Sequence, residues 1–143
     1  MTTRTAAQRQ EERRIAHRAA VAACPTQEVL GRLGDKWVPL VLRALRDGPR
    51  RHGELARTLA GARQKVLTQA LRTLERDGLV TRTVTAGVPV RVDYALTALG
   101  RSLLELVEAV EEWADRHVPA LHAARRGYDE AQRSGAPYSG GAT

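Results

Sequence analysis

Apolar residues recur every three or four positions along most of the chain, which is the period of an amphipathic helix. The pattern predicts helices over about residues 26–33, 36–46, 53–60, 63–77 and 98–122. Thr26, Asp35 and Thr97 carry oxygen atoms that can cap three of these helices. The predicted core face consists of the residues at helical spacing in the first four segments: Val29, Leu30, Leu33, Trp37, Leu40, Val41, Ala44, Leu45, Leu55, Ala56, Leu59, Val66, Leu67, Ala70, Leu71 and Leu74.

The hydrophobic pattern changes after Gly78 to the period of two that is typical of half-buried strands. Residues 79–85 and 90–96 predict two strands, joined by a turn at residues 86–89. A short helix, a tight turn, a longer helix and a hairpin thus follow one another, which is the order of a winged helix-turn-helix. The predicted fold class is mainly α with a small β-hairpin wing (α+β), flanked by dimerisation helices.

The helix predicted over residues 63–77 has two faces of different chemistry. Its polar face carries cations, amides and hydroxyls that hydrogen-bond base edges and phosphates, and no acidic residue precedes Glu75. Arg51 and His52 precede the shorter helix, while Arg82 and Arg91 lie on opposite sides of the hairpin. We expect this set to contact double-stranded DNA: Arg51, His52, Arg63, Gln64, Lys65, Thr68, Gln69, Arg72, Arg82 and Arg91.

The distribution of charge supports that expectation. The formal net charge is +7, with +3 in residues 1–23, +6 in residues 24–97 and −2 in residues 98–143. A charge excess confined to one region indicates a polyanionic partner such as an operator or promoter. A generally arginine-rich composition is the other explanation, since 21 of the 23 cations are Arg.

The helix predicted over residues 98–122 carries a narrow apolar stripe among acidic residues. The stripe has the alternating spacing of a coiled-coil seam and predicts homodimerisation. The alternative is packing on its own domain, because Leu104 and Val107 widen the stripe. The predicted dimerisation residues are Leu99, Leu103, Leu106, Val110, Trp113 and His117.

The chain divides into three predicted regions. Residues 1–23 form an N-terminal helical arm, either docked on a partner or frayed; residues 24–122 form the DNA-binding and dimerisation domain. Residues 123–143 are expected to be a C-terminal tail, largely disordered, because Gly, Ser and Pro are frequent from Gly127 onward.

Several chemistries are excluded by the sequence. Cys24 is the single cysteine, so neither an intrachain disulfide nor a multi-cysteine metal cluster can form, and a reducing cytoplasmic setting is expected. The four His residues lack metal-ligand spacing and no nucleophile motif occurs, so neither an enzyme nor a cofactor is expected. Arginines interrupt the apolar run before Cys24, which argues against a signal peptide, and no stretch reaches the roughly 18 apolar residues that span a membrane.

A chain of short motifs resembles the HxlR-type winged helix regulators. The motifs are Cys24-Pro25, Leu33–Trp37, Pro39-Leu40, Asp47–Pro49, Glu54-Leu55, Val66–Gln69, Leu74-Glu75, Asp77–Val80, Val88-Pro89 and Leu96–Gly100. The resemblance covers about residues 24–117 and implies a bacterial homodimeric regulator that represses or activates transcription. His52 replaces the aromatic residue usual in the family, Arg63 replaces the usual Ser or Thr cap, and the arm before Cys24 is longer than usual.

Some members of that family sense oxidants, quinones or aldehydes through a cysteine that matches Cys24, so the resemblance implies a redox or electrophile sensor there. Arg18, Arg32 and a helix start lie nearby in sequence, and cations and helix N-termini lower thiol pKa values. The alternative is that Cys24 is a small buried residue.

Two further functions remain open at this point. One is a regulator of the same fold whose small-molecule effector binds between subunits, next to Trp37 and Trp113. The other is a winged helix used for protein contacts, against which the basic face of residues 63–76 argues.

Overall fold

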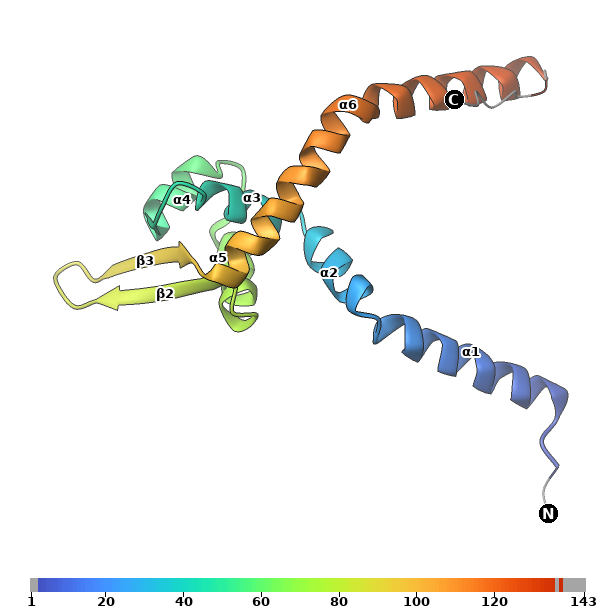
Figure 1. The fold of residues 1–143 in the computed structure, drawn as a ribbon, viewed down its shortest axis with the longest axis horizontal. Coiled ribbons are helices and arrows are strands. Elements are labelled where there is room, and N and C mark those ends of the chain that lie inside the picture. Colours follow the sequence, from blue (N-terminus) through green and yellow to red (C-terminus); the bar gives the residue numbers. More distant parts are fainter. Residues whose placement is uncertain (1–2, 136, 138–143) are drawn as a thin grey trace.

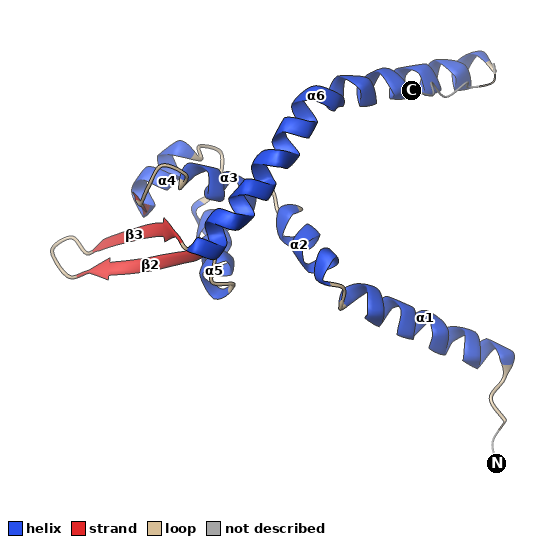
Figure 2. Ribbon diagram, in the orientation of Figure 1, coloured by secondary structure: helices blue, strands red, loops and turns tan. Residues whose placement is uncertain are grey.

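The computed structural model describes residues 3–135 and 137. The chain forms a small domain from which two helical segments project (Figure 1). In order, the elements are α1 (Ala6–Ala22), α2 (Pro25–Leu33), α3 (Trp37–Ala44), β1 (Arg50–Arg51), α4 (His52–Thr58), α5 (Gln64–Arg76), β2 (Val80–Thr85), β3 (Arg91–Leu96) and α6 (Ala98–Ser134). Helices predominate over a small antiparallel sheet (Figure 2), which confirms the predicted fold class.

The sheet has the strand order β1-β3-β2. Strands β2 and β3 form the predicted hairpin, in which Arg82 lies opposite Tyr94 and Thr85 opposite Arg91. The short strand β1 was not predicted; its two arginines pair with Tyr94 and Asp93 of β3. Because directly opposed residues share a face of the sheet and neighbours alternate, Arg82 and Arg91 lie on opposite faces.

The core lies between α3, α4, α5, the sheet and the first half of α6. Val38, Val41, Leu42 and Leu45 contribute fully buried side chains from α3 and its C-terminal residue. Trp37, Leu40 and Ala44, which were predicted to form the buried face of this helix, are only partly buried against the core. The remaining core side chains come from α4, α5, β2, β3 and α6 and from the residues that adjoin them: Leu55, Leu59, Leu67, Ala70, Leu71, Leu74, Leu79, Val80, Tyr94, Leu104 and Val107.

Four predicted core positions are wrong. Val29 and Leu30 are exposed on α2, Ala56 is exposed on α4, and Val66 is 40% exposed at the start of α5. Residues 67, 70, 71 and 74 already fill the width of helix that the core can cover, and Val66 lies at the edge of that stripe.

Helix α5 ends in a turn that aims the chain into the hairpin. Gly78 has φ +72°, in the left-handed region that favours glycine. The Leu79 N–H reaches back to the Leu74 carbonyl at 2.9 Å, the bond of a Schellman C-terminus. This turn fixes where β2 begins relative to α5.

Helix α6 begins at the predicted cap, because the Thr97 hydroxyl accepts a hydrogen bond from the Gly100 N–H at 3.0 Å. Its first half packs on the domain, and two ion pairs join it to α3 and to the turn after α3: Arg43 to Glu111 and Arg46 to Glu108, each 2.8 Å. The helix changes direction in its second half (Figure 1), where Pro119 cannot donate a backbone hydrogen bond.

Helix α6 is longer than predicted. It continues through Gly127 to Ser134, over a segment that we expected to be largely disordered. Ala, Arg, Glu and Gln are frequent between residues 123 and 134, and their helix propensity outweighs one glycine. Position 136 and positions 138–143 of the predicted tail lie outside the described residues.

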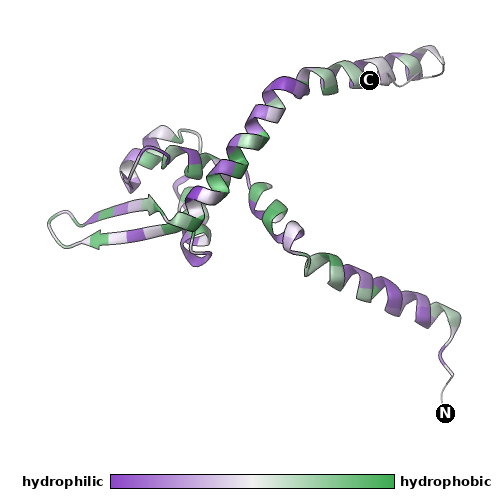
Figure 3. Ribbon diagram, viewed as in Figure 1, coloured by the Kyte–Doolittle hydropathy of each residue, from purple (hydrophilic) through white to green (hydrophobic). Residues whose placement is uncertain are grey.

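Helices α1 and α2 lie to one side of the domain (Figure 1). No residue of α1 is buried, and hydrophilic residues dominate its first half (Figure 3). Cys24, rather than the predicted Thr26, is the N-cap residue of α2. The Arg32 guanidinium donates two hydrogen bonds to the carboxylate of Asp77 and thereby ties α2 to the end of α5. Among the described residues, no helix is long and apolar enough to cross a membrane.

Candidate nucleic-acid interface

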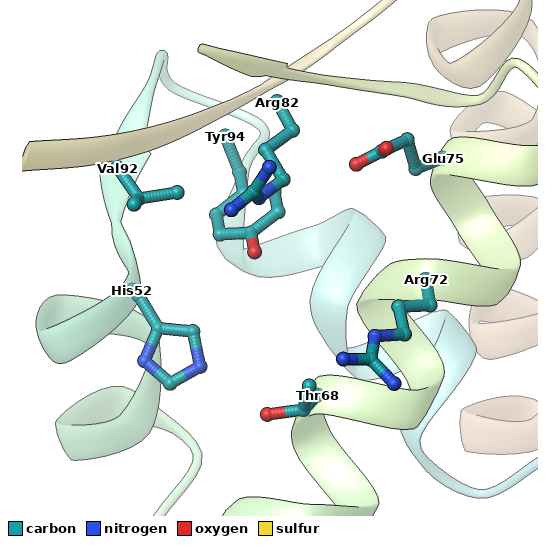
Figure 4. A pocket seen from close by; sticks show the side chains of 7 residues that line it. All are labelled: His52, Thr68, Arg72, Glu75, Arg82, Val92 and Tyr94. Atoms are coloured by element: carbon teal, nitrogen blue, oxygen red, sulfur yellow. The ribbon is translucent and has the colours of Figure 1, made fainter. Parts of the chain in front are cut away.

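A hollow of about 370 Å³ lies between α4, α5 and the sheet. Its side chains come from four elements and point toward a common space (Figure 4). Thr68, Arg72 and Glu75 project from α5, and Arg82 comes from β2. The floor is formed by Tyr94, whose ring centroid lies 6.3 Å from that of His52. Four predicted DNA contacts, which are far apart in the sequence, are therefore neighbours here: His52, Thr68, Arg72 and Arg82.

The outward face of α5 continues this surface. Gln64, Lys65, Thr68, Gln69 and Arg72 line a second, shallower hollow. None of these five side chains packs into the core, because the apolar residues of α5 lie on the opposite side of the helix. Polar donors and acceptors thus cover the N-terminal two-thirds of α5 as predicted.

A third hollow lies between α4 and the start of β3. Arg51, His52 and Arg91 line it together with Arg57. Arg57 was not predicted. The available signal was its charge, because Arg57 is the one cation of the helix predicted over residues 53–60.

Two predicted contacts differ from the rest. Arg63 lines none of these three hollows; it is the N-cap residue of α5 and makes no side-chain capping bond. Arg91 donates from Nε to Asp93 at 2.8 Å. That hydrogen bond and the carboxylate charge raise the pKa of Arg91 above its usual value and partly neutralise its field.

Three cations of this surface differ from Arg91 because they form no ion pair, although Glu75 lines the same hollow as two of them. Lys65, Arg72 and Arg82 form no ion pair with an acidic side chain anywhere in residues 3–135. On the other side of the domain, Arg43 and Arg46 are paired with glutamates of α6. Cations without internal partners keep their full attraction for an external anion, so the surface around α5 is the one suited to a polyanion.

Cys24 lies apart from this surface, at the start of α2. The backbone N–H groups of Gln27 and then of Thr26, at the start of the helix, hold the pKa of the thiol below its usual value. The helix N-terminus therefore acts as predicted. Arg32, which was expected to contribute, is turned toward Asp77 instead.

The family model described as HxlR-like helix-turn-helix matches residues 32–122. This chain belongs to the HxlR family. The match contains α3 to α5, the hairpin and the first half of α6, so every predicted DNA contact falls inside the shared region. Helix α1 and the end of α6 lie outside it.

The HxlR chain is similar to named transcriptional regulators. It is 39% identical over 102 residues to the HTH-type regulator YtfH of Escherichia coli, covering 71% of this chain and 81% of YtfH. The reduced form of YodB from Bacillus subtilis shares 36% identity, with a TM-score of 0.59 over 65% of this chain and 92% of YodB. The reduced form of the redox regulator HypR shares 35% identity, with a TM-score of 0.65 over 70% of this chain and 99% of HypR.

These relatives are transcriptional regulators and not enzymes. The HxlR protein is accordingly a DNA-binding regulator with a helix-turn-helix.

Proposed function

We propose that this HxlR protein binds a specific duplex DNA sequence as a homodimer, through the surface formed by α4, α5 and the hairpin. The proposal rests above all on the unpaired cations of α5 and β2, which converge with hydroxyl and amide side chains on one face. A winged helix that serves only as a protein-interaction module has no need of such a concentration of unpaired cations.

The side chains of this surface divide by role. Gln64, Lys65 and Gln69, on the outward face of α5, are placed to meet base edges in the major groove. Arg72 and Arg82 line the same hollow as His52 and are suited to a backbone phosphate. Arg82 therefore acts beside α5 in this proposal and not in the minor groove at the tip of the wing.

Salt-dependent binding tests the DNA proposal. A duplex selected from a random pool should bind the protein below micromolar concentration, and the logarithm of the association constant should fall linearly with that of the salt concentration, by about 0.9 per phosphate contacted. Fluorescence anisotropy between 50 mM and 200 mM salt measures both. If no selected duplex binds more tightly than a scrambled one, the sequence-specific regulator is refuted and the protein-interaction module is favoured.

The homodimer is supported by the exposed stripe of α6. Leu99, Val110 and Trp113 are more than half exposed, although each is a large apolar side chain. Leu104 and Val107 pack on the chain's own domain instead, so one face of the helix serves the fold and the other is free for a second copy.

Oxidant or electrophile sensing by Cys24 is the second part of the proposal. The relatives YodB and HypR have been solved in reduced form, YodB after diamide treatment and HypR in oxidised form. The lowered pKa of the Cys24 thiol increases its reactive thiolate fraction at neutral pH. Because no second cysteine exists in the chain, the sulfur can only form a disulfide with the other subunit or with a small thiol.

Replacing Cys24 by serine tests the sensor. Diamide or methylglyoxal should change the DNA affinity of the wild-type protein several-fold and leave that of Cys24→Ser unchanged, because serine lacks a reactive sulfur. Serine is a favourable N-cap residue, so the start of α2 should be preserved. Anisotropy titrations before and after treatment give the result, with untreated Cys24→Ser as the control. An equal response from both proteins would exclude Cys24 as the sensor.

A small-molecule effector bound next to Trp37 and Trp113 is less well supported, because the two side chains lie in different environments. Trp37 packs against the core of its own domain, whereas Trp113 lies exposed and stacked on His117.

A further inference from the structure

We propose that the ion pair between Arg32 of α2 and Asp77 at the end of α5 positions the turn from α5 into β2, and thereby sets how Arg72 and Arg82 are presented to DNA. Arg32 and Asp77 line none of the three hollows of the interface, so they act through other residues. The inference rests on the DNA-binding surface proposed above and adds two positioning residues that lie outside it.

The geometry of the pair is the first observation. The pair joins two segments that lie 45 residues apart in the sequence. The Nε and Nη2 atoms of Arg32 donate to the two carboxylate oxygens of Asp77, the second at 3.3 Å. Glu28 lies four residues before Arg32 on the same helix and lines the same groove, but the guanidinium is turned to Asp77. A contact through two atoms on each side fixes the orientation of the partners as well as their distance.

The place of Asp77 in the chain is the second observation. It lies midway between the two arginines of the hollow, five residues after Arg72 and five before Arg82. Asp77 is the C-cap residue of α5, and the chain turns at Gly78 to enter β2. A change in this turn rotates the strand relative to the helix, so it alters the position of Arg82 relative to Arg72.

The turn is held from two sides. On the side of α6, the Thr97 hydroxyl oxygen lies 2.7 Å from the carbonyl oxygen of Gly78. On the side of α2, Arg32 offsets an unfavourable charge, because the C-terminus of a helix carries partial negative charge and repels the carboxylate of Asp77. Without the guanidinium, we expect the last turn of α5 and the turn that follows it to loosen.

The loose packing of α2 is the third observation. No residue of α2 is buried, and Leu33 at its end packs only partly against the core. Within residues 3–135, the pair with Asp77 is the one ion pair that α2 makes. The side chains of Arg32 and Asp77 are 46% and 28% exposed, so the pair should contribute little to global stability. We therefore expect its loss to change DNA affinity more than it changes unfolding.

Asp77→Asn separates positioning from charge. Removing a negative charge should by electrostatics alone tighten binding to a polyanion. Loss of the pair should instead weaken binding to the selected duplex several-fold, because Arg32 is then free to turn to Glu28. Asp47→Asn is the matched control: Asp47 is exposed and forms no ion pair within residues 3–135, so this variant should bind as tightly as wild type or slightly more tightly. Fluorescence anisotropy at one salt concentration measures all three proteins, and binding by Asp77→Asn that equals or exceeds wild type overturns the proposal.

A double-variant cycle tests whether the two residues act as a unit. Arg32→Gln should weaken binding about as much as Asp77→Asn, and the double variant should lose no more than either single one, because the pair can be lost only once. Exchanging the charges, with Arg32→Asp and Asp77→Arg together, should restore part of the affinity. Urea denaturation establishes that each variant is folded under the assay conditions. Losses that simply add would contradict a shared role.

Hydrogen exchange of the free protein tests the positioning of the turn without DNA. The Leu79 N–H, which bonds the Leu74 carbonyl at 2.9 Å, should exchange several-fold faster in Arg32→Gln and in Asp77→Asn than in wild type. The Leu71 N–H in the middle of α5 is the internal control and should keep its exchange rate. Unchanged exchange at Leu79 overturns the positioning role alone, whereas a wild-type protein that binds no duplex refutes the proposed function.

Discussion

Replacing Gly100 by alanine is expected to destabilise the domain by about 3 kcal/mol or more, enough to unfold a large fraction of a marginally stable protein. A Cβ atom built at Gly100 would lie 2.0 Å from the carbonyl oxygen of Leu79. That oxygen is held in place, because it accepts hydrogen bonds from the Thr97 backbone and hydroxyl, each at 3.1 Å. The first turn of α6 would therefore have to move away from the hairpin.

Urea denaturation followed by circular dichroism measures this loss. Gly31→Ala is the matched control, since Gly31 also lies in a helix but a Cβ there would meet nothing within 4 Å. Alanine at that site should leave the free energy of unfolding unchanged or raise it by up to about 1 kcal/mol. Equal stabilities of the two variants would contradict the close packing of α6 on Leu79.

Removing both guanidinium groups of the hollow, with Arg72→Ala and Arg82→Ala together, should weaken DNA binding by about two orders of magnitude or more. Hydrogen bonds to a charged partner contribute about 1.5–3 kcal/mol each, and neither arginine has an internal partner to compensate. If both groups contact phosphate, the loss should be similar for specific and unrelated duplexes, and the salt slope should fall by about 2.

Arg76→Ala is the control for charge alone. Arg76 lies on the same helix and is exposed, but it lines none of the hollows at the interface. Its loss should change affinity much less than either of the other substitutions. Gln69→Ala adds a contrast: if Gln69 reads a base, specificity should relax at one position by about 1–3 kcal/mol. A double variant that binds as tightly as wild type at every salt concentration would remove the hollow from the interface.

The sequence predicted the elements whose signals are local. The helical spacing of Leu67, Leu71 and Leu74 predicts helix α5. The capping residue Thr97 predicts the start of α6. The same reasoning missed β1, because Arg50 and Arg51 have no strand pattern of their own. They form a strand only because β3 offers free hydrogen-bonding groups beside them.

The hollow between α4, α5 and the sheet could not be predicted from the sequence, because it depends on tertiary structure. His52 and Arg82 are separated by a whole helix-turn-helix, and their approach depends on the Gly78 turn and on the register that places Arg82 opposite Tyr94. The sequence identified both as candidates by residue type, and tertiary structure made them neighbours. The error at Val66 has the opposite cause: periodicity assigned a face, while only packing determines how wide the covered face is.

The distribution of ion pairs also makes the charge of the domain asymmetric. Arg43 and Arg46 are paired with glutamates of α6, a helix that runs away from the hairpin (Figure 1), while Lys65, Arg72 and Arg82 form no ion pair within residues 3–135. The domain is therefore an electric dipole with its positive pole at α5. In the field of a duplex such a dipole experiences a torque before any contact is made. A larger fraction of encounters then begins with α5 toward the duplex, which raises the association rate. Added salt screens the charges and shortens the range of this steering.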